Sequence, residues 1–212
     1  MEFELENISN FSDTSDLMYI LSAALSVDVG SLFLTRYYKV GGKYLNEWYD
    51  QFNILAVLVD VLIIFIGFLI ARYLYSSYLT DRFEWAPVYF MILLVGVQIL
   101  HDIIFYFGII KNVPQGNNEM IDLFKKYAED LGGIIYGGNA LVMIVCALVA
   151  MAYKAIPFSA FVAVSSVFIY AMPYILYTRN PFVVEEKAKE KEKAKEKPAF
   201  DKIDAYNRLV NN

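Results

Sequence analysis

Residues 53–75 read NILAVLVDVLIIFIGFLIARYLY, an almost uninterrupted apolar run in which the first two charged side chains are Asp60 and Arg72. At a rise of about 1.5 Å per residue, a helix of this length crosses a hydrocarbon core about 30 Å thick. An isolated strand would leave backbone amides unpaired in lipid. The run therefore predicts a transmembrane helix.

Three further blocks of the same character follow, at residues 86–110, 132–153 and 156–177. The chain has 212 residues, of which 58% are hydrophobic and 19% charged. Soluble domains average about 45–50% apolar and about 25% charged residues. The sequence thus predicts an all-α membrane protein with a four-helix transmembrane bundle over residues 53–177, between an acidic segment at 1–16, a basic and aromatic linker ending at 52, and a charged tail at 178–212.

The lysines and arginines are distributed unequally between the two sides that four spans define. Fifteen lie in one set of loops and tails, and three, Arg72, Arg82 and Lys154, lie in the other. Basic loops remain on the cytoplasmic side of a membrane. With four spans, this asymmetry predicts both termini on the cytoplasmic-type face.

A fifth apolar segment, at residues 17–34, contains Asp28. It could span the membrane, lie flat at the interface or form a re-entrant helix. We favour the interfacial interpretation, because an unpaired acid in the middle of a span is costly. If the segment spans instead, the N-terminus changes sides and the glycosylation sequons at Asn7 and Asn10 become usable.

Residues 118–131, NEMIDLFKKYAEDL, show helical periodicity with one apolar stripe. This pattern predicts an amphipathic helix on the membrane surface. The stripe consists of Met120, Leu123, Phe124, Tyr127 and Leu131.

The tail changes in character at residues 185–197, EEKAKEKEKAKEK, which have no apolar face. Glu–Lys pairs at helical spacing predict a semi-rigid helical arm. Beyond Pro198, five apolar side chains recur at roughly helical spacing and predict a tip that docks onto a protein partner. These are Phe200, Ile203, Tyr206, Leu209 and Val210.

Polar side chains inside the predicted spans form a candidate site. Comparing their distances from the ends of the spans places them at one depth, so we expect a single buried polar layer. Two carboxylates around an imidazole could relay protons, or hold an ion weakly. Alternatively, they form a charge pair and hydrogen bonds that hold the helices in register. The residues are Asp60, Gln98, His101, Asp102 and Asn139.

Other chemistry has little support in the sequence. Gly133 and Gly137 form a GxxxG pair, which favours close helix packing. The lone cysteine, Cys146, excludes a disulfide framework and a multi-cysteine metal site. The sequence has no P-loop, GxSxG, HExxH or CxxC motif. We therefore predict no enzymatic activity, metal, cofactor or nucleic-acid partner.

The stretch from Trp48 to Tyr153 resembles a group of multi-pass membrane proteins encoded by large nucleocytoplasmic DNA viruses. The elements that carry the resemblance are WYD, DVLIIFIGF, QILHD, VPQGNNEM and FKKYA. The resemblance implies an inner-membrane or minor capsid protein of a virion. It implies no site residues.

Together these features suggest a structural membrane protein that anchors a bilayer to a protein assembly, such as a viral inner membrane to its capsid. The partners expected are the lipid bilayer, the assembly and a second copy of the chain. The alternative is a small proton or ion transporter, or a channel component, that uses the Asp/His cluster.

Overall fold

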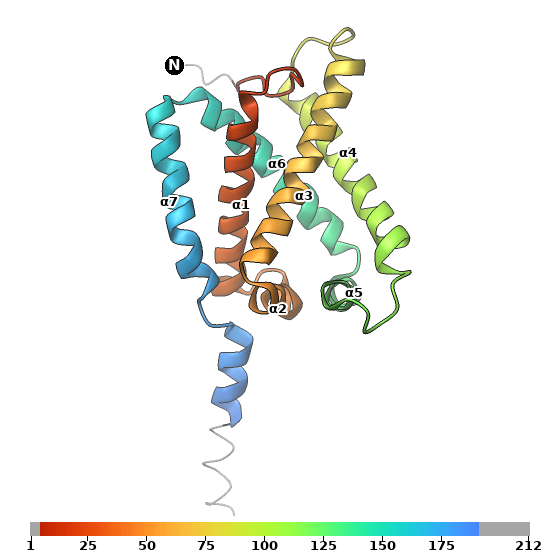
Figure 1. Cartoon of the computed structure of the whole chain (residues 1–212), viewed down its shortest axis with the longest axis vertical. Coiled ribbons are helices and arrows are strands. Elements are labelled where there is room, and N and C mark those ends of the chain that lie inside the picture. Colours follow the sequence, from red (N-terminus) through yellow and green to blue (C-terminus); the bar gives the residue numbers. More distant parts are fainter. Residues whose placement is uncertain (1–4, 191–212) are drawn as a thin grey trace, which may run out of the picture. The chain divides into compact units, whose positions relative to one another are not determined.

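The computed structural model describes residues 5–190, which form helices joined by short loops (Figure 1). The chain divides into two units, one ending at Tyr177 and the other beginning at Thr178. Within the first unit, every regular element described is helical.

Five helices in the described part of the chain are long and apolar enough to cross a membrane. Four of them match the predicted spans within a few residues, and the all-α fold class is confirmed. The chain is thus a multi-pass α-helical membrane protein. The five are α1 (Asp16–Tyr38), α3 (Ile54–Leu74) with a π-helical turn η1 (Tyr75–Leu79), α4 (Pro87–Phe105) with a π-helical turn η2 (Tyr106–Ile110), α6 (Ile134–Ala155) and α7 (Phe158–Leu176).

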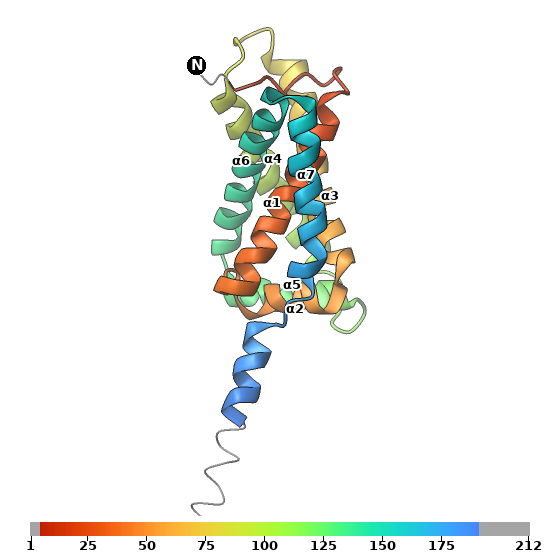
Figure 2. The same cartoon turned by 90° about the vertical axis from the view of Figure 1, so that its left-hand side faces the viewer.

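Helix α1 corrects the interfacial interpretation of residues 17–34. It runs through the middle of the bundle, alongside the other long helices, and packs against α3, α6 and α7 (Figures 1 and 2). Ala23 and Ala24 are fully buried, and such small side chains let helices approach closely. The Ser26 hydroxyl lies 2.7 Å from the hydroxyl of Tyr153 on α6. A flat surface helix would have none of these contacts.

A fifth span changes the sidedness that four spans predict. Asp16 begins α1 at one end of the bundle, and α7 ends at Leu176 at the opposite end (Figure 2). The prediction that both termini lie on one face assumed four spans, whereas five candidate spans place the start of α1 and the end of α7 at opposite ends of the bundle, so the sidedness of the termini stays a prediction.

Two short amphipathic helices lie side by side across one end of the bundle (Figure 1). They are α2 (Gly42–Phe52), which we had assigned to a linker, and α5 (Glu119–Leu131), which matches the predicted surface helix. Their aromatic rings meet, with Trp48 and Phe124 centroids 4.8 Å apart. Together α2 and α5 form what we call the platform.

Backbone chemistry positions the platform. Gly41 has φ +77°, in the left-handed region, and a Cβ there would lie 2.3 Å from Leu45 Cδ2. The turn between α1 and α2 therefore needs a glycine. Asn118 caps α5, since its side-chain oxygen accepts from the backbone N–H of Ile121 at 3.1 Å.

Gly67 on α3 is a glycine that lies against two neighbouring helices. A Cβ added there would lie 2.8 Å from Met143 Cε on α6 and 3.8 Å from Gln98 Oε1 on α4. Gly133 and Gly137, the predicted packing pair, have no atom of the chain within 4 Å of an added Cβ. Within one chain, the packing role therefore belongs to Gly67 and not to the GxxxG pair.

The second unit begins with residues 178–180 and continues as a helix over residues 181–190. From Val183 onward its side chains are exposed, as expected for an arm without an apolar face. The rest of the predicted arm, and the tip at Phe200, Ile203, Tyr206, Leu209 and Val210, lie outside the described residues.

Replacing Gly67 with valine should destabilise the bundle by about 1–3 kcal/mol, because the added methyl groups clash with the buried Met143. The measurement is denaturant unfolding in detergent micelles. Gly137→Val is the matched control and should change stability little. Equal losses in the two variants would contradict the assignment.

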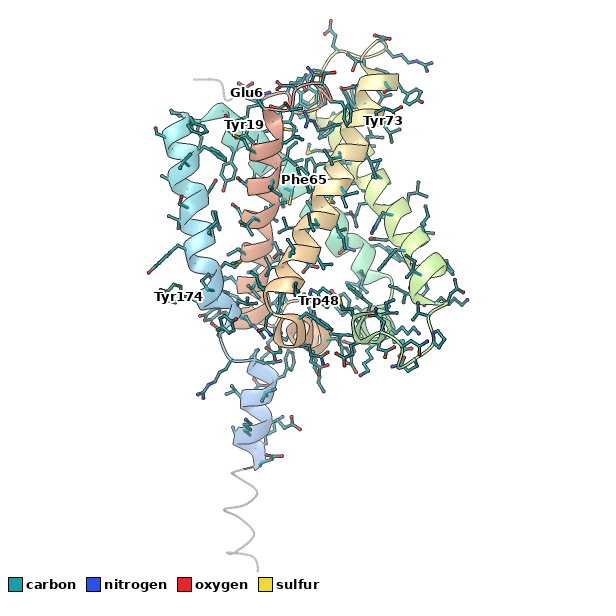
Figure 3. All side chains as sticks on the ribbon, in the orientation of Figure 1. Glu6, Tyr19, Trp48, Phe65, Tyr73 and Tyr174 are labelled. Carbon is teal, nitrogen blue, oxygen red and sulfur yellow. The ribbon has the colours of Figure 1, made fainter. Side chains whose placement is uncertain are left out.

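Five spans also predict which exposed positions share a side of the membrane. Cysteines introduced singly at Glu6 (labelled in Figure 3) and Arg82 should react with an impermeant maleimide from the same side, and one at Lys126 only from the other side. The native Cys146 is fully buried and should stay unlabelled. Labelling of positions 6 and 126 from one side would restore the four-span arrangement.

Candidate functional site

Four of the five predicted site residues converge on one carboxylate, Asp102 of α4. It accepts from Gln98 Nε2 at 2.7 Å and from Asn139 Nδ2 of α6 at 2.8 Å, and His101 Nδ1 lies 3.2 Å from it. The His101 side chain is 38% exposed, whereas that of Asp102 is 13% exposed. This group, the Asp102 network, cross-links α4 to α6.

Asp60 is not part of that network, contrary to the predicted single polar layer. Its Oδ2 accepts from Trp48 Nε1 of α2 at 3.0 Å. Burial and then the charge of Asp60 raise the pKa of Tyr127, on α5, to about 12. Asp60 therefore faces the platform. The comparison of depths failed because depth along a helix does not determine which face a residue occupies.

A second carboxylate, Asp28 of α1, lies close to Asp60 and was missing from the predicted site. The Tyr49 hydroxyl donates to Asp28 Oδ1 over 3.4 Å and also interacts with Asp60. Asp28 is 4% exposed and Tyr49 is 2% exposed. Burial, and after it the two carboxylates, raises the pKa of Tyr49 well above its usual range, so its phenol remains a donor. In the sequence, Asp28 served only as a reason to doubt that residues 17–34 cross the membrane.

At the platform end of the bundle, the buried Arg36 of α1 joins three helices. Its Nη2 lies 2.7 Å from Asp50 Oδ1 of α2 and donates to the backbone oxygen of Leu176, the last residue of α7, at 3.3 Å. Its Nη1 donates to Asn46 Oδ1 at 3.1 Å. Asn46 in turn donates to the Thr35 carbonyl of α1 at 3.1 Å. This group is the Arg36 clamp.

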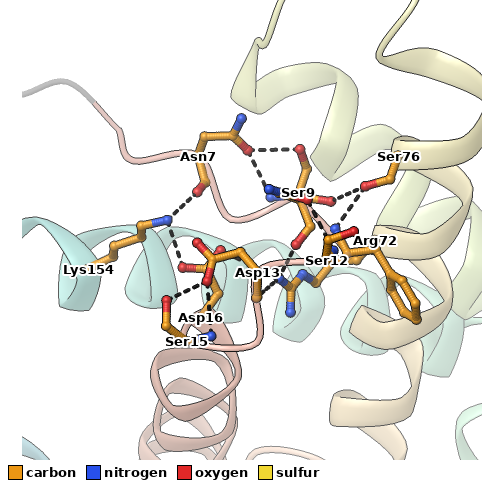
Figure 4. Close-up of polar contacts among 11 residues, drawn as sticks. Asn7, Ser9, Ser12, Asp13, Ser15, Asp16, Arg72, Ser76 and Lys154 are labelled. Atoms are coloured by element: carbon orange, nitrogen blue, oxygen red, sulfur yellow. Dashed lines mark hydrogen bonds and ion pairs between the residues drawn. The ribbon is translucent and has the colours of Figure 1, made fainter.

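At the other end, the fully buried Arg72 of α3 holds the segment that precedes α1 (Figure 4). Its Nη2 donates to the backbone oxygens of Asn10 and, at 2.6 Å, of Asp13, and lies 3.5 Å from Asp16 Oδ2. We call this group the Arg72 clamp. In the sequence, Arg72 contributed only to the count of positive charges that predicts the orientation in the membrane.

Two more side chains hold the same N-terminal segment in place (Figure 4). Lys154 Nζ of α6 lies 2.7 Å from Asp16 Oδ1 and donates to the Asn7 carbonyl at 2.7 Å. The Ser76 hydroxyl of η1 donates to the Ser9 carbonyl at 3.0 Å. The acidic segment of the sequence is thus a folded cap over this end of the bundle.

Neither polar group inside the bundle has the composition of a metal centre. Among residues 5–190, no three or more His, Cys, Asp and Glu side chains are grouped so that they could hold a metal ion. What the arrangement offers is hydrogen bonding across helices and, at Asp28 and Asp60, two neighbouring carboxylates. Comparison with known protein families, curated proteins and solved structures finds no match for this chain.

Replacing Arg72 with methionine should destabilise the protein by about 3–5 kcal/mol, because it removes the buried ion pair to Asp16 Oδ2 and the donor to the Asn10 and Asp13 carbonyls. The variant should also lose protection of residues 5–15 against protease. Arg82→Met, in an exposed loop near the same end, is the control and should be near neutral. Wild-type stability in Arg72→Met would contradict the role of the clamp.

Proposed function

We propose that this protein is a structural membrane protein that anchors a lipid bilayer to a protein assembly on the platform side. The single observation that supports this most directly is the Arg36 clamp, because it fastens the end of α7, from which the charged arm continues, to α1 and α2. An anchor must transmit force from its arm to its membrane part.

The chemistry of the clamp suits that purpose. The last carbonyls of a helix lack partners within the helix. At Leu176 one of these carbonyls accepts from a guanidinium that is 1% exposed and paired with Asp50. Hydrogen bonds from charged donors are stronger than neutral ones, and low exposure shields them from water. The end of α7 is therefore held to α1 and α2 by strong hydrogen bonds.

The charge distribution supports an orientation with the platform on the cytoplasmic-type face and the N-terminus opposite. Adding α1 as a span does not move any base, because residues 1–15 contain no lysine or arginine. Of the three bases at the N-terminal end, Arg72 and Lys154 both pair with Asp16. The excess of positive charge on the platform side is then larger than the count suggests.

The resemblance to membrane proteins of large DNA viruses makes a viral capsid a specific candidate for the assembly. In that setting the platform and the arm would face the shell across the inner membrane. The arm at residues 185–197 carries six lysines and intersperses them with acids, a pattern suited to a protein surface of mixed charge.

The alternative of a proton or ion transporter has less support. It required Asp60, His101 and Asp102 in one relay, but Asp60 bonds to Trp48 while Asp102 bonds to Gln98 and Asn139. The hydrogen bonds of the Asp102 network join helices, which is a structural role.

Deleting residues 185–212 should release the protein from the assembly while leaving it in the membrane. We expect lateral diffusion in the native membrane to rise several-fold, because the bilayer alone then resists motion. Single-molecule tracking of protein labelled at Arg82→Cys, in an exposed loop outside the deleted residues, measures this.

The matched control keeps residues 198–212 and replaces 185–197 with a glycine–serine linker of equal length. It separates the contribution of the tip from that of the stiff arm. Unchanged diffusion after the full deletion would reject the anchoring function.

A further inference from the structure

Asp28 and Asp60 are two carboxyl groups on neighbouring helices with few donors. Trp48 donates to Asp60 at 3.0 Å, and Tyr49 donates to Asp28 at 3.4 Å. The second oxygen of Asp28, Oδ2, is buried and has no hydrogen-bond partner. A buried ionised oxygen without a donor is costly, whereas a protonated one carries no charge and can itself donate.

Among the described residues, the side chains that act on the pair carry no positive charge. Around the pair, α2 presents Tyr49, α5 presents Tyr127 toward Asp60, and α6 presents the neutral thiol of Cys146 toward Asp28. The ionisable side chains of α7, Tyr170 and Tyr174, are exposed on its outer surface. The nearest described arginine on α1, Arg36, is paired with Asp50.

We propose that Asp28 and Asp60 form a proton-binding site, in which the pair shares one proton and thereby joins α1 to α3 beside α2. Two like charges around one phenol, in a region of low dielectric, repel strongly, so the pair binds one proton rather than ionising twice. A divalent cation would require about six oxygen ligands, and the groups around this pair provide fewer.

The site has a mechanical consequence for α2. Tyr49 and Trp48 attach α2 to the pair, and Asp50 and Asn46 of the same helix attach it to Arg36. Loss of the shared proton would place two negative charges around Tyr49, and their repulsion would push α1 and α3 apart beside α2. The inference concerns the membrane bundle alone and does not depend on what the arm binds.

The sign of the pH dependence follows from linkage. A pair that holds a proton in the folded state and releases it on unfolding binds more protons when folded. Stability is then greatest below the pKa of the unfolded carboxyls, falls as the pH rises above it, and stops falling once the folded pair has lost its proton.

The first test is thermal unfolding of the full chain in detergent between about pH 6 and about pH 9. The wild-type melting temperature should fall by up to about 3 °C per pH unit while the folded pair holds its proton, and should level off once that proton is lost. Asp28→Asn and Asp60→Asn should each flatten this slope, and the double variant should be no flatter than either. Glu47→Gln, on the outer part of α2, is the control and should keep the wild-type slope. Wild-type slopes in both asparagine variants would overturn the proposal.

A second measurement uses the unmodified protein and remains decisive if a variant fails to fold. Infrared difference spectra of the full chain in lipid nanodiscs should contain the carbonyl band of an un-ionised carboxylic acid at neutral pH. That band should disappear at high pH and return on acidification. Its absence at neutral pH would overturn the proposal.

Discussion

The fold depends on supplying hydrogen-bond donors to backbone oxygens at the two ends of a membrane bundle. Helix ends and loops leave carbonyls unpaired, and water is scarce where they are buried. One arginine solves this at each end. Arg36 donates to Leu176, and Arg72 donates to Asn10, while each guanidinium is neutralised by one nearby aspartate. Arginine suits this task because its charge is permanent and its planar group directs several N–H donors at once.

These two clamps determine which segments belong together. The Arg36 clamp holds α2, which forms part of the predicted basic linker, against α1 and the end of α7. The Arg72 clamp and Lys154 bind backbone oxygens of residues 5–15, and so hold this segment over the end of the bundle as a cap. The aromatic side chains that the clamps leave outside, such as Tyr73 and Tyr174, point away from the bundle near its ends (Figure 3), where amphipathic rings suit the membrane interface.

The sequence alone was sufficient for the apolar spans and for α5, because length, hydropathy and helical periodicity are local properties. It was insufficient wherever the structure depends on contacts between side chains of different helices. Asp28 disfavoured a span in the sequence because it had no visible partner there. In the structure Tyr49 of α2, a helix that the sequence did not predict, donates to it. Gly133 and Gly137 matched a packing motif, yet the glycine that lies against side chains of neighbouring helices is Gly67. A motif or a depth gives a residue's position along the helix axis. Packing also depends on which face of the helix the residue occupies.

The Asp102 network and the pair of Asp28 and Asp60 differ in the number of hydrogen-bond donors that reach their carboxyl groups. This difference distinguishes a structural cross-link from a proton-binding site. Asp102 accepts from Gln98 and Asn139 and lies beside His101, so a negative charge there is compensated by dipoles from two helices. Asp28 and Asp60 together have one indole and one phenol as donors, and one buried oxygen has none. A carboxyl group with sufficient donors serves as a hydrogen-bonded cross-link between helices. A pair with too few donors must obtain the missing hydrogen from solution, and this requirement makes the second group, and not the predicted one, the place where pH acts on the fold.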